Sequence, residues 1–360
     1  MSLRTTLISL GLATALALTG CATGGTPSAS PACTPSASST ASPDPTPSCT
    51  PTATPTPTPT PVEYAPLTGE EVVPGSLDHP VLMAKIDNLD EARPQAGIND
   101  TDIVFEELVE GGLTRYVAVW HSTVPKYIGP VRSIRPMDPD IASPFRGIIA
   151  FSGGQYRFVV MMQNTKVKNI IDGLSPSQKY MFRDSKRVAP HNVIVRASKL
   201  VDAYSKLSPP TPAFAFAHGT DVPTAVALGD PRGKLTTSFS EFNTPSWKWD
   251  AATGLYKRYQ AGGDKDVDEH HKQLTAVNVI VQMTDESSEY GYVPRAHVVG
   301  KGTAYISTGG STVKAIWRKA NRNAMTHYTL KDGTEVTLAP GNTWIELIPT
   351  TTGRFSASRR

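Results

Sequence analysis

The chain has 360 residues, 39% of them hydrophobic, and a formal net charge of +3. This length and apolar content suffice for a folded core, and a nearly balanced charge without a long basic run argues against nucleic acid as a partner. The three cysteines all lie before residue 50, so the rest of the chain has neither a thiol nucleophile nor a disulfide framework.

Residues 1–20 have the pattern of a secretory signal peptide. Arg4 precedes an apolar run from Leu7 to Leu18, and small residues lead into Cys21. The run is shorter than the ~20 residues that a membrane-spanning helix needs. We expect cleavage before Cys21 and its lipidation with palmitate, the pattern of a bacterial lipoprotein anchored at the extracytoplasmic face of the cell membrane. The alternative is an ordinary signal peptide followed by an incidental cysteine.

Residues 21–62 are predicted to form a disordered stalk. Proline, serine, threonine and alanine dominate this segment, and a Thr-Pro repeat runs from Thr54 to Pro61. The stalk has almost no apolar side chains to bury and favours the extended polyproline conformation, at ~3.1 Å per residue. Cys33 and Cys49 could pair in an oxidising compartment or remain two unconstrained thiols, and the sequence leaves both open.

Residues 63–210 are predicted to form a mixed α/β domain, because short apolar runs alternate with segments of helical periodicity. Gly111-Gly112 separates two strand-like segments and predicts a β-hairpin with a two-residue turn. The predicted elements are strands at 81–86, 103–110, 113–120 and 148–151, and helices at 155–163 and 197–207.

Residues 211–360 are predicted to form a second, mostly antiparallel β domain, so the expected fold class is α+β. Aromatic segments at 247–250 and 256–259 flank Thr253-Gly254 as two arms of a hairpin, and Lys331-Asp332-Gly333 is a strong turn signal. Further strands are predicted at 277–281, 302–307, 313–317, 328–330, 335–338 and 344–348.

The first hairpin carries a candidate polar cluster. With a two-residue turn, Leu108 lies opposite Arg115, and Arg115 is diagonal to both Glu106 and Glu110 on one face of the sheet. The cluster is either a structural ion-pair network or the floor of a polar pocket. As an acid/base pair the two glutamates fit poorly, since four strand residues separate their backbones by ~13 Å.

A second candidate segment runs from Gly129 to Pro136. It places Arg132 and Arg135 between prolines in a stiff backbone, and arginine forks suit carboxylates and phosphates. Ser152-Gly153-Gly154 lies between a predicted strand and helix, where free backbone N–H groups could hold an anion. The alternatives are two solvated arginines and a tight turn.

A third candidate is the polar loop that contains Arg183 and His191. His191 could act as a base beside Asp87 or Asp184, or it could be a hydrogen-bonded structural histidine. No cofactor is expected, since the nucleotide-binding glycine signatures are absent.

No metal site is expected either. Asp264, Asp266 and Asp268 begin like a calcium loop, but Glu269 stands where glycine is needed and Thr275 where a bidentate glutamate should be.

The chain resembles the YerB-like bacterial lipoproteins, a family with N- and C-terminal domains of unknown function. The resemblance covers nearly everything after the stalk, and it implies two domains but no established activity. It rests on Pro66–Gly69, Ile86–Asn88, Ala92–Gly97, Asp102–Glu106, Val109–Arg115, Ile128–Ser133, Phe182–Asp184, Ala189–Asn192, Gly300–Gly302 and Pro340–Ile345.

These features favour a cell-envelope binding protein with a polar cleft for a charged ligand, such as a peptidoglycan or wall-polymer fragment. The alternatives are a cell-wall hydrolase or transferase that uses Glu106 or His191 as acid/base, and a non-catalytic scaffold for envelope proteins. The expected ligand-binding residues are Asp87, Arg93, Glu106, Glu110, Arg115, Arg132, Arg135, Arg183 and His191.

Overall fold

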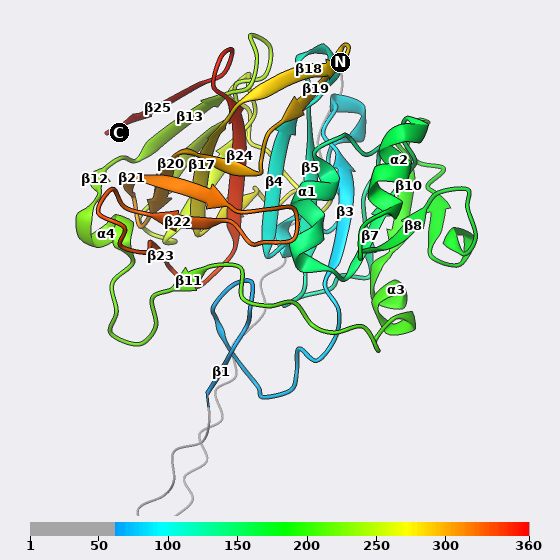
Figure 1. Ribbon diagram of the computed structural model, residues 1–360, viewed down its shortest axis with the longest axis horizontal. Helices are drawn as coiled ribbons and strands as arrows, with labels where there is room; N and C mark the ends of the chain where they lie inside the picture. The colour runs from blue at the N-terminus through cyan, green and yellow to red at the C-terminus, as the bar shows by residue number, and fades with distance from the viewer. Residues whose placement is uncertain (1–61, 360) are drawn as a thin grey trace, which may run out of the picture. The chain divides into compact units, whose positions relative to one another are not determined.

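The computed structural model describes residues 62–359, which belong to one compact unit (Figure 1). Strands hold 41% of the residues and helices 13%, so the fold is mostly β-structure with few helices. The predicted signal peptide, the lipidated Cys21 and the stalk with Cys33 and Cys49 lie outside the described residues.

An eleven-stranded sheet forms the centre of the molecule (Figure 1). Its hydrogen-bonded order is β12 (Asp230–Pro231), β21 (Ser311–Lys319), β20 (Gly300–Thr308), β17 (Asn278–Thr284), β24 (Thr343–Pro349), β4 (Ile103–Leu108), β5 (Thr114–Trp120), β3 (Leu82–Asp87), β7 (Ile148–Phe151) and β8 (Lys168–Ile171), with β22 (His327–Thr329) paired to β21.

Strands from both halves of the sequence meet within this sheet. β24 pairs in parallel with β4 from Thr343↔Ile103 to Leu347↔Glu107, and on its other edge with β17. The pairing joins residues 63–210 to residues 211–360 through backbone hydrogen bonds. The arrangement of two separate domains is therefore not confirmed, although β20 pairs antiparallel with both β17 and β21, as expected for residues 211–360.

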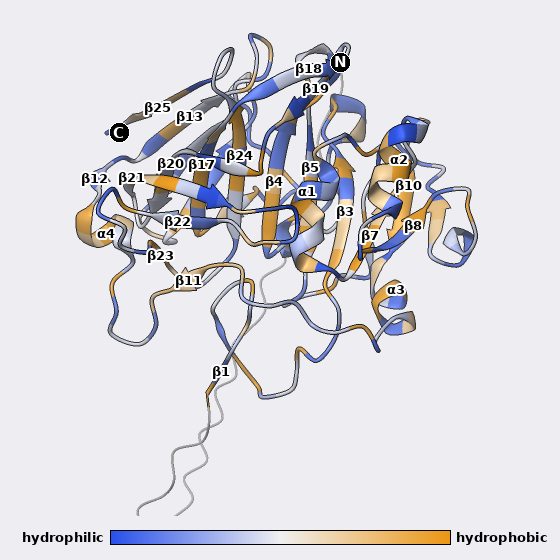
Figure 2. Ribbon diagram, viewed as in Figure 1, coloured by the Kyte–Doolittle hydropathy of each residue, from blue (hydrophilic) through white to orange (hydrophobic). Residues whose placement is uncertain are grey.

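Each face of the central sheet packs against smaller elements. On one face Ile141 of α1 (Asp138–Ala142) and Phe158 and Met162 of α2 (Tyr156–Gln163) join an apolar cluster with β3, β5 and β7. On the other face Leu200 of α3 (Ala197–Ala203) and Trp247 of β14 (Ser246–Asp250) cover the same strands. Because both faces are buried, β3, β4, β5 and β7 carry apolar runs with few polar interruptions, and Figure 2 shows orange stretches broken by blue in β3 and β4.

The covering elements are short. The helices are α1 (Asp138–Ala142), α2 (Tyr156–Gln163), α3 (Ala197–Ala203) and α4 (Thr224–Leu228). The five-stranded sheet contains β16 (Thr275–Ala276), β15 (Leu255–Tyr259), β14 (Ser246–Asp250), β13 (Lys234–Ser238) and β25 (Arg354–Ser358). The smaller sheets are β6 (Tyr127–Ile128) with β10 (Val193–Arg196) and β9 (Met181–Arg183), β1 (Glu63–Tyr64) with β2 (Glu71–Val72), β11 (Ala215–Phe216) with β23 (Thr337–Leu338), and β18 (Glu286–Tyr290) with β19 (Val293–Ala296).

The predicted strands and helices are confirmed with shifted ends, but the turn of the first hairpin is not a two-residue turn. Leu108 pairs with Thr114, and the Val109 N–H donates to the Leu113 carbonyl across a five-residue connection. A tight turn over Glu110–Gly112 fills that connection, with Gly111 at φ 73° and Gly112 at φ 74°, both in the left-handed region that favours glycine. The pairing register therefore differs by one residue, which moves every opposing side chain to a new partner.

Two buried carboxyl groups make the stability of this fold depend on pH. Burial, followed by the nearby Asp138, raises the pKa of Glu107 to about 8, and burial raises the pKa of Asp102 to about 7. A carboxyl group with a raised pKa keeps its proton in the folded state after the unfolded chain has released it. Its stabilising contribution is complete below the unfolded pKa near 4 and is lost as the pH rises to the folded pKa.

We expect the free energy of unfolding to fall by roughly 1 to 2 kcal/mol between pH 6.5 and pH 8, since one pKa unit is worth about 1.4 kcal/mol. Urea unfolding of residues 59–360 at the two pH values measures the change. Glu107→Gln carries no ionisable group at this position and should remove most of the slope. A wild-type stability that stays constant or rises over this interval would contradict the prediction.

Candidate functional site

A buried carboxylate at the end of β3 organises one polar cluster. Asp87 is the last residue of β3 and its side chain is fully buried. The Nδ1 atom of His191 lies 2.6 Å from Asp87 Oδ2, and the Nε atom of Arg132 lies 3.0 Å from the same oxygen. Of the two carboxylates considered for His191, the structure thus selects Asp87. Three segments far apart in sequence meet here.

Two more arginines join this cluster through the backbone of Ser133. The Nη1 atoms of Arg115 and Arg135 donate to the Ser133 carbonyl at 2.9 and 3.2 Å, and Arg135 Nε donates to Glu110 Oε2 at 2.7 Å. Burial, together with the positive charge of Arg135, lowers the pKa of Arg115 to about 10. Burial is the main cause of the lowered pKa, and the neighbouring Arg135 and Arg132 add to it while Asp87 and Glu110 oppose it.

We call Arg115, Arg132 and Arg135, with Asp87, Glu110 and His191, the arginine cluster. Three guanidinium groups face two carboxylates, so the cluster has an excess of one positive charge when His191 is neutral. The arginines are partly accessible, since the Arg132 side chain is 20% exposed and that of Arg135 is 10% exposed.

The strand-to-helix turn singled out in the sequence lies beside the arginine cluster. Ser152 N–H donates to the Arg132 carbonyl and Ile134 N–H donates to the Gly153 carbonyl, both at 3.0 Å. Helix α2 begins just after this turn without a side-chain cap. The start of α2, the end of a helix that favours anions, thus follows directly on a turn that is bonded to the backbone of the Arg132 segment.

Glu106 does not belong to this cluster, which corrects the predicted face shared with Arg115 and Glu110. The shifted register puts Glu107, not Leu108, opposite Arg115. Neighbouring strand residues point to opposite faces, so Glu106 faces the five-stranded sheet instead. There it is fully buried and lies 2.6 Å from an Nη atom of Arg258.

Arg258 of β15 lies at the centre of a second, enclosed charge cluster. Its guanidinium contacts three carboxylates, Glu106 at 2.6 Å, Asp266 at 2.9 Å and Glu346 at 3.0 Å. Its guanidinium carbon, Cζ, lies 4.8 Å from the ring centre of Trp344. Burial, opposed by the charge of Arg258, raises the pKa of Glu106 well above its usual value. A proton retained on Glu106 reduces the net negative charge of the three carboxylates around the single guanidinium. Because Glu106 is enclosed in this cluster, we assign it a structural role.

The remaining predicted residues lie at the periphery. Arg93 donates to the Asn88 carbonyl at 2.8 Å, pairs with Asp90, and lines a groove of about 490 Å³. Arg183 is 56% exposed and pairs with Asp172 at 2.9 Å. Within residues 62–359 no group of three or more His, Cys, Asp or Glu side chains could hold a metal ion.

Sequence reasoning missed a third buried network below the arginine cluster. Lys85 of β3 pairs with Glu107 and, at 2.9 Å, with Asp138 of α1, and all three side chains are fully buried. A signal was available, because Lys85 interrupts an apolar strand and Glu106 and Glu107 are adjacent in another. Alternation puts those two glutamates on opposite faces, so each needs its own cation.

Comparison with known proteins places the chain in a family. Residues 67–209 match the N-terminal domain, and residues 235–345 the C-terminal domain, of a protein of unknown function, DUF3048. The chain belongs to the DUF3048 family. A relative named "Putative lipoprotein YerB" from Bacillus subtilis (strain 168) is 24% identical over 290 residues, which are 79% of this chain and 86% of the relative.

A solved structure has a fold like that of this chain. The crystal structure of the YerB protein from Bacillus subtilis matches with a TM-score of 0.70 and 21% identity, over 82% of this chain and 99% of that one. The likeness at this identity concerns the fold alone. Among the residues that the structure describes, no helix of this DUF3048 chain is long and apolar enough to span a membrane.

We expect Arg258→Met to destabilise the protein by about 3 to 5 kcal/mol, because it leaves Glu106, Asp266 and Glu346 buried without a cation. Glu106→Gln should cost clearly less, because the raised pKa of Glu106 favours its protonated form. Arg183→Met, a matched change at an exposed arginine, should stay within about 0.5 kcal/mol. Urea unfolding at pH 7 measures all three. If Arg258→Met lowers the free energy of unfolding no more than Arg183→Met does, the structural role assigned to the Arg258 cluster is contradicted.

Proposed function

We propose that this protein is a lipoprotein, anchored through Cys21 at the extracytoplasmic face of the cell membrane, that binds an anionic cell-envelope ligand at the arginine cluster. A peptidoglycan or wall-polymer fragment supplies the carboxylate or phosphate groups that such a cluster takes. The small residues before Cys21 and the name of the Bacillus subtilis relative both support the lipid anchor.

The positive excess of the arginine cluster carries this proposal. Arg115 and Arg135 share the Ser133 carbonyl, Arg132 lies against Asp87, and the three arginines have only two carboxylate partners, Asp87 and Glu110. Arg115 is 7% exposed, and its Nε has no hydrogen-bond partner among the described residues. Buried cations without full pairing are costly, and an anion that enters beside them would supply the missing acceptors. The uncapped start of α2 adds further donors from the neighbouring turn.

A hydrolase or transferase is the second candidate, and the His191–Asp87 contact favours it. A carboxylate at 2.6 Å from Nδ1 fixes the orientation of the imidazole and leaves Nε2 available as a base. Glu106 is a poor acid/base candidate, because it is fully buried and bound by Arg258 and Thr114. His191 is therefore the residue to test for catalysis.

Sedimentation with purified cell-wall sacculi tests the binding function. We expect residues 59–360 to sediment with the wall, and Arg132→Gln with Arg135→Gln to reduce the bound fraction at least tenfold without a loss of folding. Binding should also weaken as the salt concentration rises, since the contacts are ionic. Arg232→Gln is the matched control, because Arg232 forms an exposed ion pair with Asp230 on β12.

Mass spectrometry of the supernatant separates the two candidates. Soluble wall fragments that disappear with His191→Gln would establish the hydrolase or transferase in place of a binding protein. Sedimentation that is indifferent to the two arginine changes would exclude the arginine cluster as the binding site. If the protein neither sediments with the wall nor releases fragments from it, the wall is excluded as the ligand.

A further inference from the structure

A groove at the far end of the sheet from the arginine cluster has the composition of a ligand site. Its volume is about 750 Å³, within the range of small-molecule pockets. It begins where β7 and β8 begin, whereas the arginine cluster lies at the last residue of β3, which runs parallel to β7. Six strand residues, roughly 20 Å, therefore separate the two. We call it the proline groove, and its lining includes Pro144, Phe145, Arg146, Lys166, Lys168, Leu207, Pro209, Pro210 and Met325.

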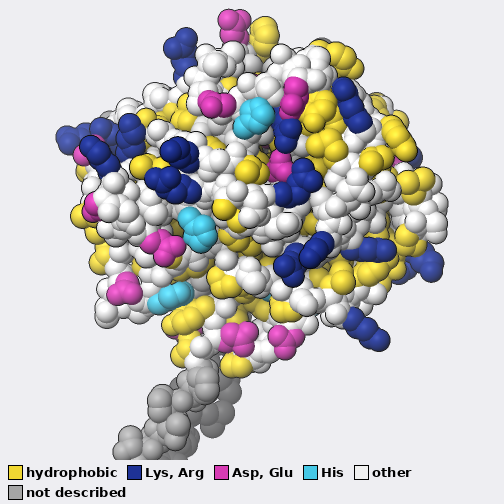
Figure 3. Space-filling view, in the orientation of Figure 1, with side chains coloured by type: hydrophobic (Ala, Val, Ile, Leu, Met, Phe, Trp, Pro, Cys, Tyr) yellow, Lys and Arg dark blue, Asp and Glu magenta, His cyan; other side chains and the backbone are white. Residues whose placement is uncertain are grey.

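The charges in the proline groove are all positive. Arg146, Lys166 and Lys168 are exposed there, and its lining contains no aspartate or glutamate. None of the three cations forms an ion pair within the described part of the chain, although Lys168 lies over the ring of Tyr204. Figure 3 shows lysine and arginine side chains in separate groups on this face of the molecule, without one continuous basic surface. A local group of three unpaired cations is suited to a phosphate.

The backbone of Arg146 is strained. It has φ 61° and ψ −76°, a region that residues with a side chain rarely adopt and that glycine adopts readily. An arginine at a position where glycine would fit better indicates that the side chain is retained for something other than stability. Its location in the groove suggests that the retained property is the guanidinium charge.

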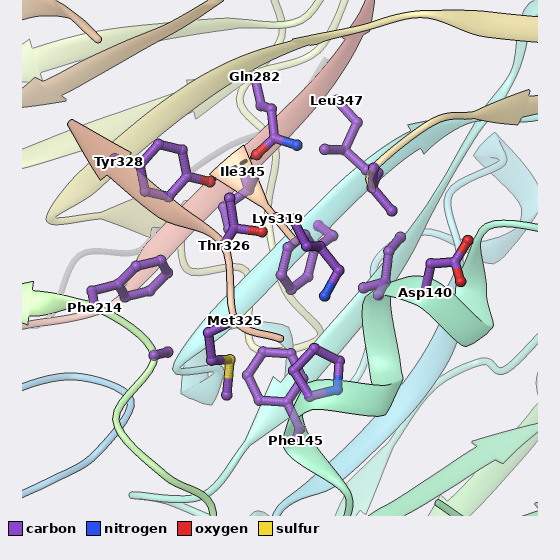
Figure 4. A pocket seen from close by; sticks show the side chains of 15 residues that line it. Asp140, Phe145, Phe214, Gln282, Lys319, Met325, Thr326, Tyr328, Ile345 and Leu347 are labelled. Atoms are coloured by element: carbon purple, nitrogen blue, oxygen red, sulfur yellow. Dashed lines mark hydrogen bonds between the residues drawn. The ribbon is translucent and has the colours of Figure 1, made fainter. Parts of the chain in front are cut away.

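The walls of the groove favour apolar contact over peptide binding. Pro144, Pro209 and Pro210 have no backbone N–H, so these walls cannot pair with an added peptide strand. Phe145 and Met325 continue from the groove into a narrow cavity of about 30 Å³, whose lining in Figure 4 includes Phe214 and Tyr328. An aliphatic segment can lie against this apolar side while its charged end meets the cations.

We propose that the proline groove binds a phosphate-bearing amphiphile. The phosphate lies between Arg146, Lys166 and Lys168, and the aliphatic part packs against Phe145 and Met325. The site is separate from the arginine cluster, so the inference does not depend on the function proposed above.

Calorimetric titration of residues 59–360 with monomeric dihexanoyl phosphatidic acid at low salt tests the proposal. We expect saturable binding, which weakens at least tenfold with Arg146→Gly while stability to urea stays the same or rises. His271→Gly is the matched control, because His271 also has a left-handed backbone, at φ 58°, but lies outside the groove. It should leave the affinity unchanged. Lys166→Gln with Lys168→Gln gives a second loss of binding that does not alter backbone strain.

Two comparison ligands test each part of the amphiphile. Dihexanoyl phosphatidylcholine, without net charge, and inorganic phosphate, without an aliphatic part, should both bind at least tenfold more weakly. Equal binding of inorganic phosphate would overturn the apolar contact, and unchanged affinity in Arg146→Gly would overturn the site. An absence of binding to all three probes would mean that the cations are only solvated surface charges. The titrations are repeated in Arg132→Gln with Arg135→Gln, which removes phosphate binding at the arginine cluster, and the preference for phosphatidic acid should persist in that variant.

Discussion

The contact of Arg258 with three carboxylates joins the parts of this protein. Glu106 lies on β4, Glu346 on β24 and Asp266 beyond β15, so one guanidinium connects the central sheet to the five-stranded sheet that covers it. The aromatic rings of Trp247 and Trp344 exclude water from the cluster. Charges buried in this way stabilise only if each has a partner, so the position of Arg258 constrains both sheets at once. The parallel pairing of β24 with β4 holds Glu346 opposite Glu106, so backbone hydrogen bonds keep two of the three carboxylates together.

Strand alternation distributes the other buried charges around this centre. Glu106 and Glu107 are adjacent, yet one faces Arg258 and the other faces Lys85 on the opposite side of the sheet. The polar residues near β3 and β5 are thus divided between two enclosed networks and one partly accessible cluster. Only the accessible one, around Arg115 and Asp87, has cations in excess and a route to solvent. This difference in exposure, more than the number of charged residues, separates a candidate binding site from structural ion pairs.

The two surface sites lie at opposite ends of the parallel strands β3 and β7. The arginine cluster draws on the sheet's carboxyl end and on the uncapped start of α2, whereas the proline groove draws on the chain that enters β7 and β8. Both combine arginine with a stiff, proline-containing backbone, which fixes the direction of the cations. Under the two proposals, the protein contacts an envelope polymer at one end of these strands and an amphiphile at the other.

The sequence by itself determined the positions of most strands, the helix after β7 and the family, because hydrophobic periodicity and short motifs are local properties. It also identified Asp87, Arg132 and His191 as candidate ligand-binding residues through their residue types. Only the tertiary structure decided the register of the first hairpin and the membership of the clusters. A one-residue shift exchanges the two faces of a strand, and Arg258 is 152 residues from Glu106, so neither the face of Glu106 nor its partner could be read from local pattern.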